Sequence, residues 1–262
     1  MNMRRGAFVL LLLLIVAAGV ILLRPGASYS QQDRAALLAP SSHAHLAGTD
    51  AMGRDRLIRV AAALLLCLSG AALAAALSTL AAAVIGTISA LAGSSVGWAT
   101  LLLCDVFLAL PWMFLLMMVR CAMPLTASPL SSAAITFLVL AALGWPACAR
   151  AVYRGALQLR NSDWMLYATA TGLRRSQILR VLVPNLWPLL LPQFLVSVPA
   201  FVVAEANLGA LGLGIGEPLP SWGGMLLELD NSALLMQTNW IYLPVALLVV
   251  VLLLLEAITV EA

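Results

Sequence analysis

Six arginines lie between residues 150 and 180 of a chain that is 63% hydrophobic and only 10% charged. They are Arg150, Arg154, Arg160, Arg174, Arg175 and Arg180. A guanidinium group binds carboxylate or phosphate oxygens through paired hydrogen bonds. The segment therefore predicts contacts either with acidic residues of a partner protein or with anionic lipid headgroups, and its composition favours neither.

Catalysis by the chain itself is not expected. All 14 of its basic residues are arginines, so the lysine that a phosphate-binding P-loop or a Schiff-base enzyme needs is absent. The sequence also has no GxSG or HExxH motif and no paired aspartates in neighbouring apolar runs, which argues against an intramembrane enzyme. We expect no cofactor on this chain and no nucleic-acid partner.

The sulfur and imidazole groups indicate no metal site. The four cysteines are widely spaced and form no CxxC pair, so they are expected to be small core residues. They are Cys67, Cys104, Cys121 and Cys148. His43 and His45 form an HAH sequence in a polar stretch, a pattern typical of an ordinary loop.

The elements that must position these residues are membrane helices. The mean hydropathy of +1.03 exceeds what a soluble core requires. Residues 6–23 carry no charge, and Asp105 is the only charged residue between Val60 and Val119. Runs of about eighteen or more apolar residues match the thickness of a bilayer. The chain is therefore expected to be an all-α polytopic membrane protein.

Six spans are expected, separated by short turns and one long polar loop. They cover residues 6–23, 71–92, 99–120, 132–149, 186–204 and 240–255. The run 57–92 is too long for one span, so we expect a break near residues 68–73 and an interfacial helix before it. Three prolines, at positions 188, 192 and 199, are expected to interrupt the fifth span.

The first span could instead be a cleaved signal peptide, because Arg4 and Arg5 precede it. Its length and the lack of a clear cleavage site favour a retained helix. A polar loop follows, up to about residue 56, in which Asp50, Arg54 and Asp55 are expected to cap the next helix and pair with one another.

Six spans place both termini on one side of the membrane. Eight arginines share that side, namely Arg4, Arg5 and the six between residues 150 and 180, against six on the other side. The positive-inside rule then places both termini and the arginine-rich segment in the cytoplasm. No internal repeat is visible, which argues against the alternative of a secondary carrier that acts without an ATPase.

Within the arginine-rich segment, the sequence "DWMLYATATGLRRSQILRVLVPN" predicts two short helices. Asn161, Ser162 and Asp163 are suitable N-cap residues for a helix that runs to residue 171. Gly172 permits the left-handed turn that ends it, and a second helix over residues 174–183 is stopped by Pro184. The second helix is apolar on one face and basic on the other.

This segment resembles the cytoplasmic coupling loop of ABC-importer permeases, which reads E-A-A, three residues, G, and ends in a hydrophobic-Pro-Asn sequence. The matching residues are Asp163, Trp164, Ala168, Ala170, Gly172, Pro184 and Asn185. Leu166 stands where that family has its glutamate, and Tyr167 where it has its first alanine. The resemblance therefore implies docking through contacts other than that glutamate.

Two further blocks narrow the resemblance. "GTDAMGRDRLIRV" at residues 48–60 is similar to the G-T-D-x-x-G-R-D-x-x-x-R signature of dipeptide and oligopeptide importer permeases. "AEANLGALGLGIGEPLPSWGGML" at residues 204–226 is similar to a second signature of the same class. The similarity covers about residues 48–230. The chain thus resembles the C-type permease subunit of a dipeptide/oligopeptide/nickel-class ABC importer.

That resemblance implies a type I ABC-importer permease fold, in a bacterial inner membrane. The N-terminal helix and outer loop would be residues 1–56, and the permease core residues 57–262, with a coupling loop at about 150–184. The implied partners are a homologous second permease, two ATP-binding subunits that hold ATP and Mg²⁺, and an extracytoplasmic solute-binding protein. The substrate stays open among dipeptides, longer peptides, glutathione, antimicrobial peptides and metal chelates.

The resemblance also implies roles for single residues. In the coupling loop, Ala168, Ala170, Gly172 and Pro184 would shape the docking element. Apart from the resemblance, we expect Arg174, Arg175 and Arg180 to contact either acidic residues of the ATPase or lipid headgroups. In the outer loop and gate, the implied residues are Glu205, Gly212, Gly214, Pro220, Trp222 and Gly223. We expect Glu205 to brace this loop rather than line the pathway, and Trp222 to be an interfacial anchor. Asp105 is expected either to line the pathway or to make a structural hydrogen bond.

Overall fold

The computed structural model describes residues 3–122, 124, 128–172, 177, 184–231 and 239–260, and at positions 164, 166, 168 and 169 the backbone alone. In these residues the regular structure is helical, which confirms the expected all-α class. The helices are α1 (Met3–Leu22), α2 (Arg56–Ala92), α3 (Ser94–Ala109), α4 (Trp112–Ala122), α5 (Pro129–Arg160), α6 (Asp163–Ala170), α8 (Trp187–Ala210), α9 (Trp222–Leu226), η1 (Leu227–Asp230), η2 (Asn239–Tyr242) and α11 (Leu243–Thr259).

The central helix α2 is unbroken over 37 residues, so the predicted break near residues 68–73 is wrong. Gly70 lies inside this helix, where its lack of a side chain makes room for a neighbour. A Cβ atom at this position would lie 2.3 Å from the ring of Phe137 on α5. At 1.5 Å rise per residue, α2 is about 55 Å long, well beyond the thickness of the hydrocarbon core.

The predicted third span is two helices, α3 and α4, bent by 75°. Pro111 lacks an N–H group, and Leu110 before it takes the extended conformation that a following proline favours. The turn between α2 and α3 is also tighter than expected. It consists of Gly93 alone, whose φ of 116° is open to glycine but rarely to other residues.

Helices α5 and α8 both extend beyond the predicted spans. α5 continues to Arg160, so the first part of the arginine-rich segment is a continuation of a membrane helix rather than a loop. α8 runs from Trp187 to Ala210 without interruption, although Pro192 and Pro199 lie inside it. Membrane helices accommodate such prolines because neighbouring groups satisfy the freed carbonyls.

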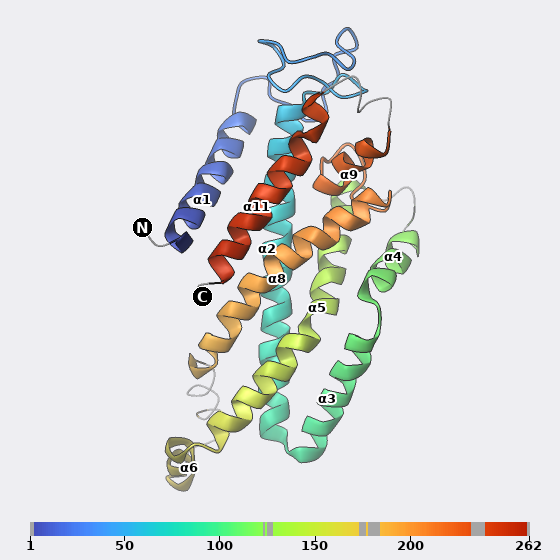
Figure 1. Cartoon of the computed structure of the whole chain (residues 1–262). Coiled ribbons are helices and arrows are strands. Elements are labelled where there is room, and N and C mark those ends of the chain that lie inside the picture. Colours follow the sequence, from blue (N-terminus) through green and yellow to red (C-terminus); the bar gives the residue numbers. More distant parts are fainter. Residues whose placement is uncertain are drawn as a thin grey trace.

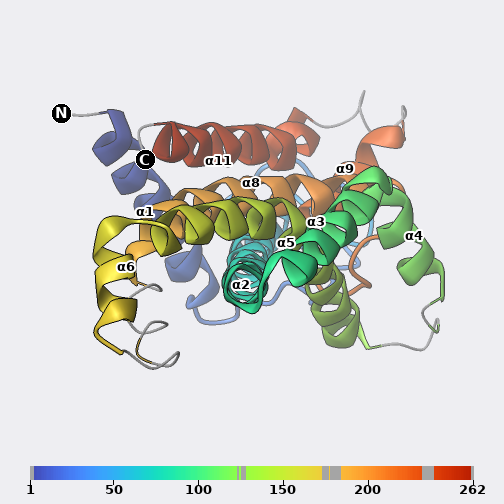
Figure 2. The ribbon, with the colours of Figure 1, turned by 90° about the horizontal axis from the view of Figure 1, so that it is seen from below.

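Helix α2 lies at the centre of the bundle, with α5 and α8 packed along it (Figure 1). α1 and α11 lie side by side at one flank, as the view along the axis of α2 also shows (Figure 2). The long polar loop lies at one end of the bundle, which we call the outer end. α6 lies at the opposite end, and the chain termini face that same direction at the ends of α1 and α11.

Five of the described helices are long and apolar enough to cross a membrane, and the bent pair α3–α4 makes a sixth crossing. Near the α6 end, Gly97 of α3 lies against the phenol of Tyr153, where a Cβ atom would be 2.1 Å from the hydroxyl oxygen. At the outer end, Arg120 of α4 reaches the carbonyl of Leu213. The pair therefore connects the two ends of the bundle, as six spans require.

Candidate functional site

At the α6 end, the predicted short helix is confirmed as α6, which lies beyond the end of α5 (Figure 1). Met165 is buried with 1% of its surface exposed, and it anchors the helix to the bundle. Tyr167 is 74% exposed and points away from the bundle core. Gly172 has a φ of 82°, the left-handed conformation expected where the helix ends.

Within the arginine-rich segment, Arg150 and Arg160 bind groups of this chain, whereas the sequence predicted contacts with a partner protein or with lipid headgroups. Arg150 pairs with Asp105 across α5 and α3. Arg160 Nη1 donates a hydrogen bond to the carbonyl oxygen of Ala90 at 2.7 Å. Arg154 is exposed. Asp105 thus has a partner inside the bundle, and its role on a transport pathway stays a prediction.

The rest of the predicted coupling loop is only partly described. Ala170 and Pro184 are exposed at the surface. Arg174, Arg175, Arg180, the side chain of Ala168 and the predicted helix over residues 174–183, apart from position 177, lie outside the described residues. The docking roles predicted for these residues therefore stay predictions.

At the outer end, the predicted capping of α2 is confirmed. Asp55 Oδ1 accepts a hydrogen bond from the backbone N–H of Ile58 at 3.0 Å. Asp50 Oδ1 accepts the N–H groups of Met52 and Arg54, both at 2.9 Å, and fixes the turn before the helix. His45 Nδ1 lies 2.9 Å from Asp55 Oδ2, so this histidine belongs to the packing of the loop.

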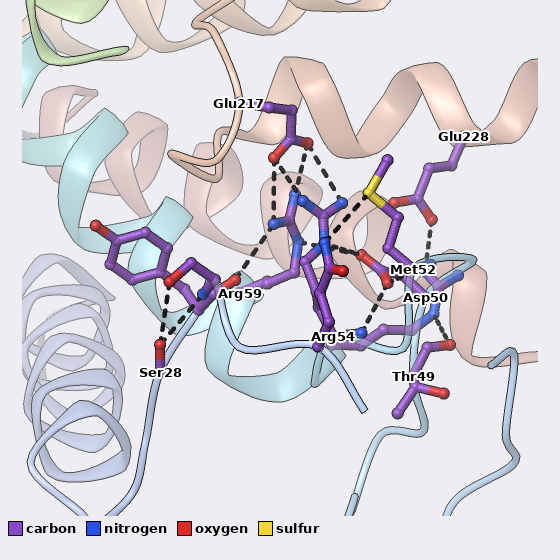
Figure 3. Close-up of polar contacts among 12 residues, drawn as sticks. Ser28, Thr49, Asp50, Met52, Arg54, Arg59, Glu217 and Glu228 are labelled. Atoms are coloured by element: carbon purple, nitrogen blue, oxygen red, sulfur yellow. Dashed lines mark hydrogen bonds and ion pairs between the residues drawn. The ribbon is translucent and has the colours of Figure 1, made fainter. Parts of the chain in front are cut away.

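The same turn begins an ion-pair cluster that the sequence predicted only in part (Figure 3). Arg54 Nε donates to Asp50 Oδ2 at 2.6 Å, the predicted pair, and Arg54 Nη1 donates to Glu217 Oε2, also at 2.6 Å. Arg59 Nη2 donates to the other oxygen of Glu217 at 2.9 Å. Burial alone would lower the pKa of Arg54, but its hydrogen bonds to the two carboxylates outweigh burial and raise that pKa.

A second connection joins the start of α2 to the segment after α9. Arg56 Nη1 lies 2.8 Å from Glu228 Oε2, and Arg56 Nε donates to the carbonyl oxygen of Thr49 at 3.1 Å. Figure 3 shows both groups of contacts on the same side of the loop. We call the six charged residues of this cluster the outer clasp: Asp50, Arg54, Arg56, Arg59, Glu217 and Glu228.

Arg120, at the end of α4, holds the glycine-rich loop that follows α8. Its Nε donates to the carbonyl oxygen of Leu213 at 2.7 Å, and a terminal nitrogen donates to that of Gly214. Its Nη1 donates to the hydroxyl of Ser132 at 2.6 Å, and the same hydroxyl accepts the N–H of Gly216 at 3.3 Å. A cavity of about 410 Å³ lies beside this loop, partly lined by Arg120.

Glu205 is fully buried within α8, where it meets α2 and α9. The thiol of Cys67 donates to Glu205 Oε2 at 3.3 Å. The Ser221 hydroxyl and the N–H of Gly223 also face this carboxylate. Glu205 on α8 therefore lies against the start of α9. The position supports the bracing role predicted for Glu205, while a role in the pathway stays untested.

The short helix α9 folds back tightly onto α8. A Cβ atom on Gly223 would lie 2.5 Å from the Cα of Gly209, which explains why both positions are glycine. Gly212 supplies the left-handed turn between the two helices, with a φ of 76°. As a result Trp222 is fully buried rather than placed at the membrane interface, so the predicted interfacial anchor is wrong. Pro220 is buried beside it.

Among the described residues, no group of three or more histidines, cysteines or acidic residues could hold a metal ion. The outer clasp and Arg120 instead connect segments that are distant in the sequence, and α6 is displayed beyond the bundle. These contacts hold segments of the chain that are distant in the sequence close together.

Comparison with known proteins gives a consistent result. The family model for binding-protein-dependent transport system inner membrane components matches residues 82–260. The oligopeptide transport system permease protein OppC of Mycobacterium tuberculosis is 32% identical over 232 residues, which cover 86% of this chain and 76% of that protein. The dipeptide transport system permease protein DppC of Bacillus subtilis is 29% identical over 221 residues, 84% and 67% of the two chains.

Other relatives are longer than the region they share with this chain. The oligopeptide transport system permease protein OppC of Haemophilus influenzae is 29% identical over 202 residues, which cover 75% of this chain but 61% of that protein. The family match nevertheless extends from the last third of α2 to the end of α11 and includes α6 and the glycine-rich loop. The chain belongs to the family of binding-protein-dependent transport system inner membrane components.

Proposed function

We propose that this chain is a permease subunit of an ATP-driven importer, without catalytic activity of its own. It would pair with a homologous permease, receive solute from an extracytoplasmic binding protein, and couple to two ATP-binding subunits that hold ATP and Mg²⁺. Alternating access would then follow from closure of those subunits. The relatives named for oligopeptide and dipeptide transport support a peptide as the solute.

The observation that carries this proposal is the position of α6. The helix lies past the end of the bundle and is anchored by Met165, while Tyr167 is 74% exposed. An exposed short helix with one anchored face is suited to a groove on another protein. α6 follows directly after α5, so a force on α6 reaches a helix that packs along α2.

The direction of the chain in the membrane is part of the proposal. The free ends of α1 and α11 face the α6 end of the bundle. In the sequence, α6 lies within the arginine-rich segment. The positive-inside rule places this end in the cytoplasm, where ATP-binding subunits reside. The outer clasp and the glycine-rich loop would then face the binding protein.

The test is affinity purification of the full chain in mild detergent from the cells in which it naturally occurs, followed by mass spectrometry and an ATPase assay. We expect a second permease and two ATP-hydrolysing subunits to be recovered. Tyr167→Glu should reduce the recovery of the ATPase, because it places a charge on the exposed face of α6.

Tyr242→Glu is the matched control, since Tyr242 is 50% exposed on η2 and lies away from α6. It should leave ATPase recovery unchanged. A chain that purifies alone and moves solute without nucleotide would contradict the proposal and support a secondary carrier.

A further inference from the structure

The contact between Cys67 and Glu205 is covered by α9. Both side chains are fully buried, although Glu205 is ionisable. Ser221 and Gly223 of the α9 start face the carboxylate, and the backbone of Trp222 faces the thiol. While α9 stays in this position, it shields Cys67 from reagents in water.

The outer clasp holds α9 on both sides. Glu217 precedes α9 and pairs with Arg54 and Arg59, while Glu228 follows α9 and pairs with Arg56. All three arginines are buried at the start of α2. The segment that covers Cys67 is thus tied at each end to the same helix turn.

The two carboxylates that share Arg54 are held very differently. Asp50 has a side chain that is 2% exposed and accepts two backbone N–H groups, so it is built into the turn. The side chain of Glu217 is 54% exposed, and in the described part of the chain its side-chain hydrogen bonds and ion pairs are all with the two arginines. Water can therefore replace those contacts at Glu217 but not at Asp50.

We propose that Glu217 is the releasable carboxylate of the outer clasp. When it leaves Arg54 and Arg59, the segment that contains α9 loosens from α2 and exposes Cys67. Asp50 remains on both arginines, so their charge stays partly neutralised while the clasp is open. The role of this release as the opening of an outer gate rests on the proposed permease function, but the release itself is a property of this chain alone.

The test uses the full chain in lipid nanodiscs, with Cys104→Ala, Cys121→Ala and Cys148→Ala so that Cys67 is the remaining thiol. The rate of maleimide labelling of Cys67 is measured with and without Glu217→Gln. We expect Glu217→Gln to raise this rate about fivefold, because the change removes the charge from both of the partly exposed ion pairs that Glu217 forms. Asp230→Asn, at an exposed carboxylate on η1, is the matched control and should leave the rate unchanged.

A salt series supplies a second measurement that needs no change at Glu217. Raising the salt from about 0.05 M to about 1 M screens the half-exposed pair, so labelling of the parent protein should accelerate, and that of Glu217→Gln should accelerate less. The proposal would be overturned if Cys67 were labelled at the same rate in the parent and in Glu217→Gln. It would also be overturned if Asp230→Asn raised the labelling rate as much as Glu217→Gln does. If Glu217→Gln fails to fold, the salt series on the parent protein is sufficient: a labelling rate of Cys67 that does not change with salt would overturn the proposal. No partner protein is present, so these outcomes are independent of whether the chain imports peptides.

Discussion

The guanidinium group of Arg160 donates a hydrogen bond at 2.7 Å to the carbonyl oxygen of Ala90, in the last turn of α2. Arg160 is also the last residue of α5, and α6 begins three positions later. The bond therefore joins the end of α2 to the place where α6 leaves the bundle. Because α2 is unbroken as far as Arg56 and Arg59, one rigid helix links this place to the outer clasp.

Arg160→Ala should weaken that link. It leaves the carbonyl of Ala90 without its protein partner, and we expect the free energy of unfolding to fall by about 1 kcal/mol. In the proposed importer, ATP hydrolysis should respond less to solute, because the hydrogen bond that joins the end of α2 to the end of α5 before α6 is lost. Thermal unfolding in detergent and solute-stimulated ATPase activity check the two effects. Arg154→Ala, at an exposed arginine one turn and a half earlier, should change neither.

Arg120→Lys should loosen the glycine-rich loop. A lysine has one compact ammonium group and does not reach the carbonyls of Leu213 and Gly214 and the hydroxyl of Ser132 together. We expect a loss of about 2 kcal/mol of stability, as for hydrogen bonds from a charged group, and faster proteolysis within residues 211–221. Limited proteolysis with mass spectrometry locates the cleavage. Arg24→Lys, at an exposed position, should be cut at the same rate as the parent.

Gly223→Ala should displace α9 from α8. The added Cβ atom would lie 2.5 Å from the Cα of Gly209 and 2.8 Å from the carbonyl oxygen of Glu205, and backbone atoms do not yield as a flexible side chain does. We expect overpacking to cost about 1–3 kcal/mol and to make Cys67 more reactive towards maleimide. At Gly224 a Cβ atom would be 3.5 Å from the nearest atom, so Gly224→Ala is the control and should behave as the parent.

The sequence predicts the local elements of this fold well where one segment determines its own structure. The helix at 163–170, the left-handed turn at Gly172 and the cap at Asp55 follow from residues within a few positions of one another, and the structure confirms them. The continuity of α2 could not be predicted in this way. At the position of the predicted break, Gly70 packs against Phe137, a residue distant in the sequence that no local pattern indicates.

The candidate site shows the same division. Asp50 and Arg54 are four residues apart, and their pairing was predicted. The contacts of Glu217 with Arg54 and Arg59 bridge more than 150 residues, and no local pattern indicates which carboxylate those arginines meet. Arg120 is one of the six arginines predicted to lie on the side opposite the termini, and the sequence assigned it no further role. Its partners are mainly backbone carbonyls of a distant loop, which no local pattern indicates. The burial of Trp222 likewise depends on the close approach of Gly209 and Gly223.

The pair formed by Asp105 and Arg150 allows a structural role to be separated from a role in the pathway. Their side chains are 56% and 33% exposed, so the pair is expected to contribute about 0.5–1 kcal/mol rather than the several kcal/mol of a buried pair. A cycle of Asp105→Asn, Arg150→Gln and the double variant measures this coupling through thermal unfolding. If the role of both residues is only to pair with each other, the double variant should be no less stable than either single variant. Its solute uptake should then equal that of Arg150→Gln. A different result would assign Asp105 to the pathway: both variants that lack Asp105 lose more uptake than Arg150→Gln, while their stability is unchanged. The charge of Asp105 would then affect solute or water independently of Arg150.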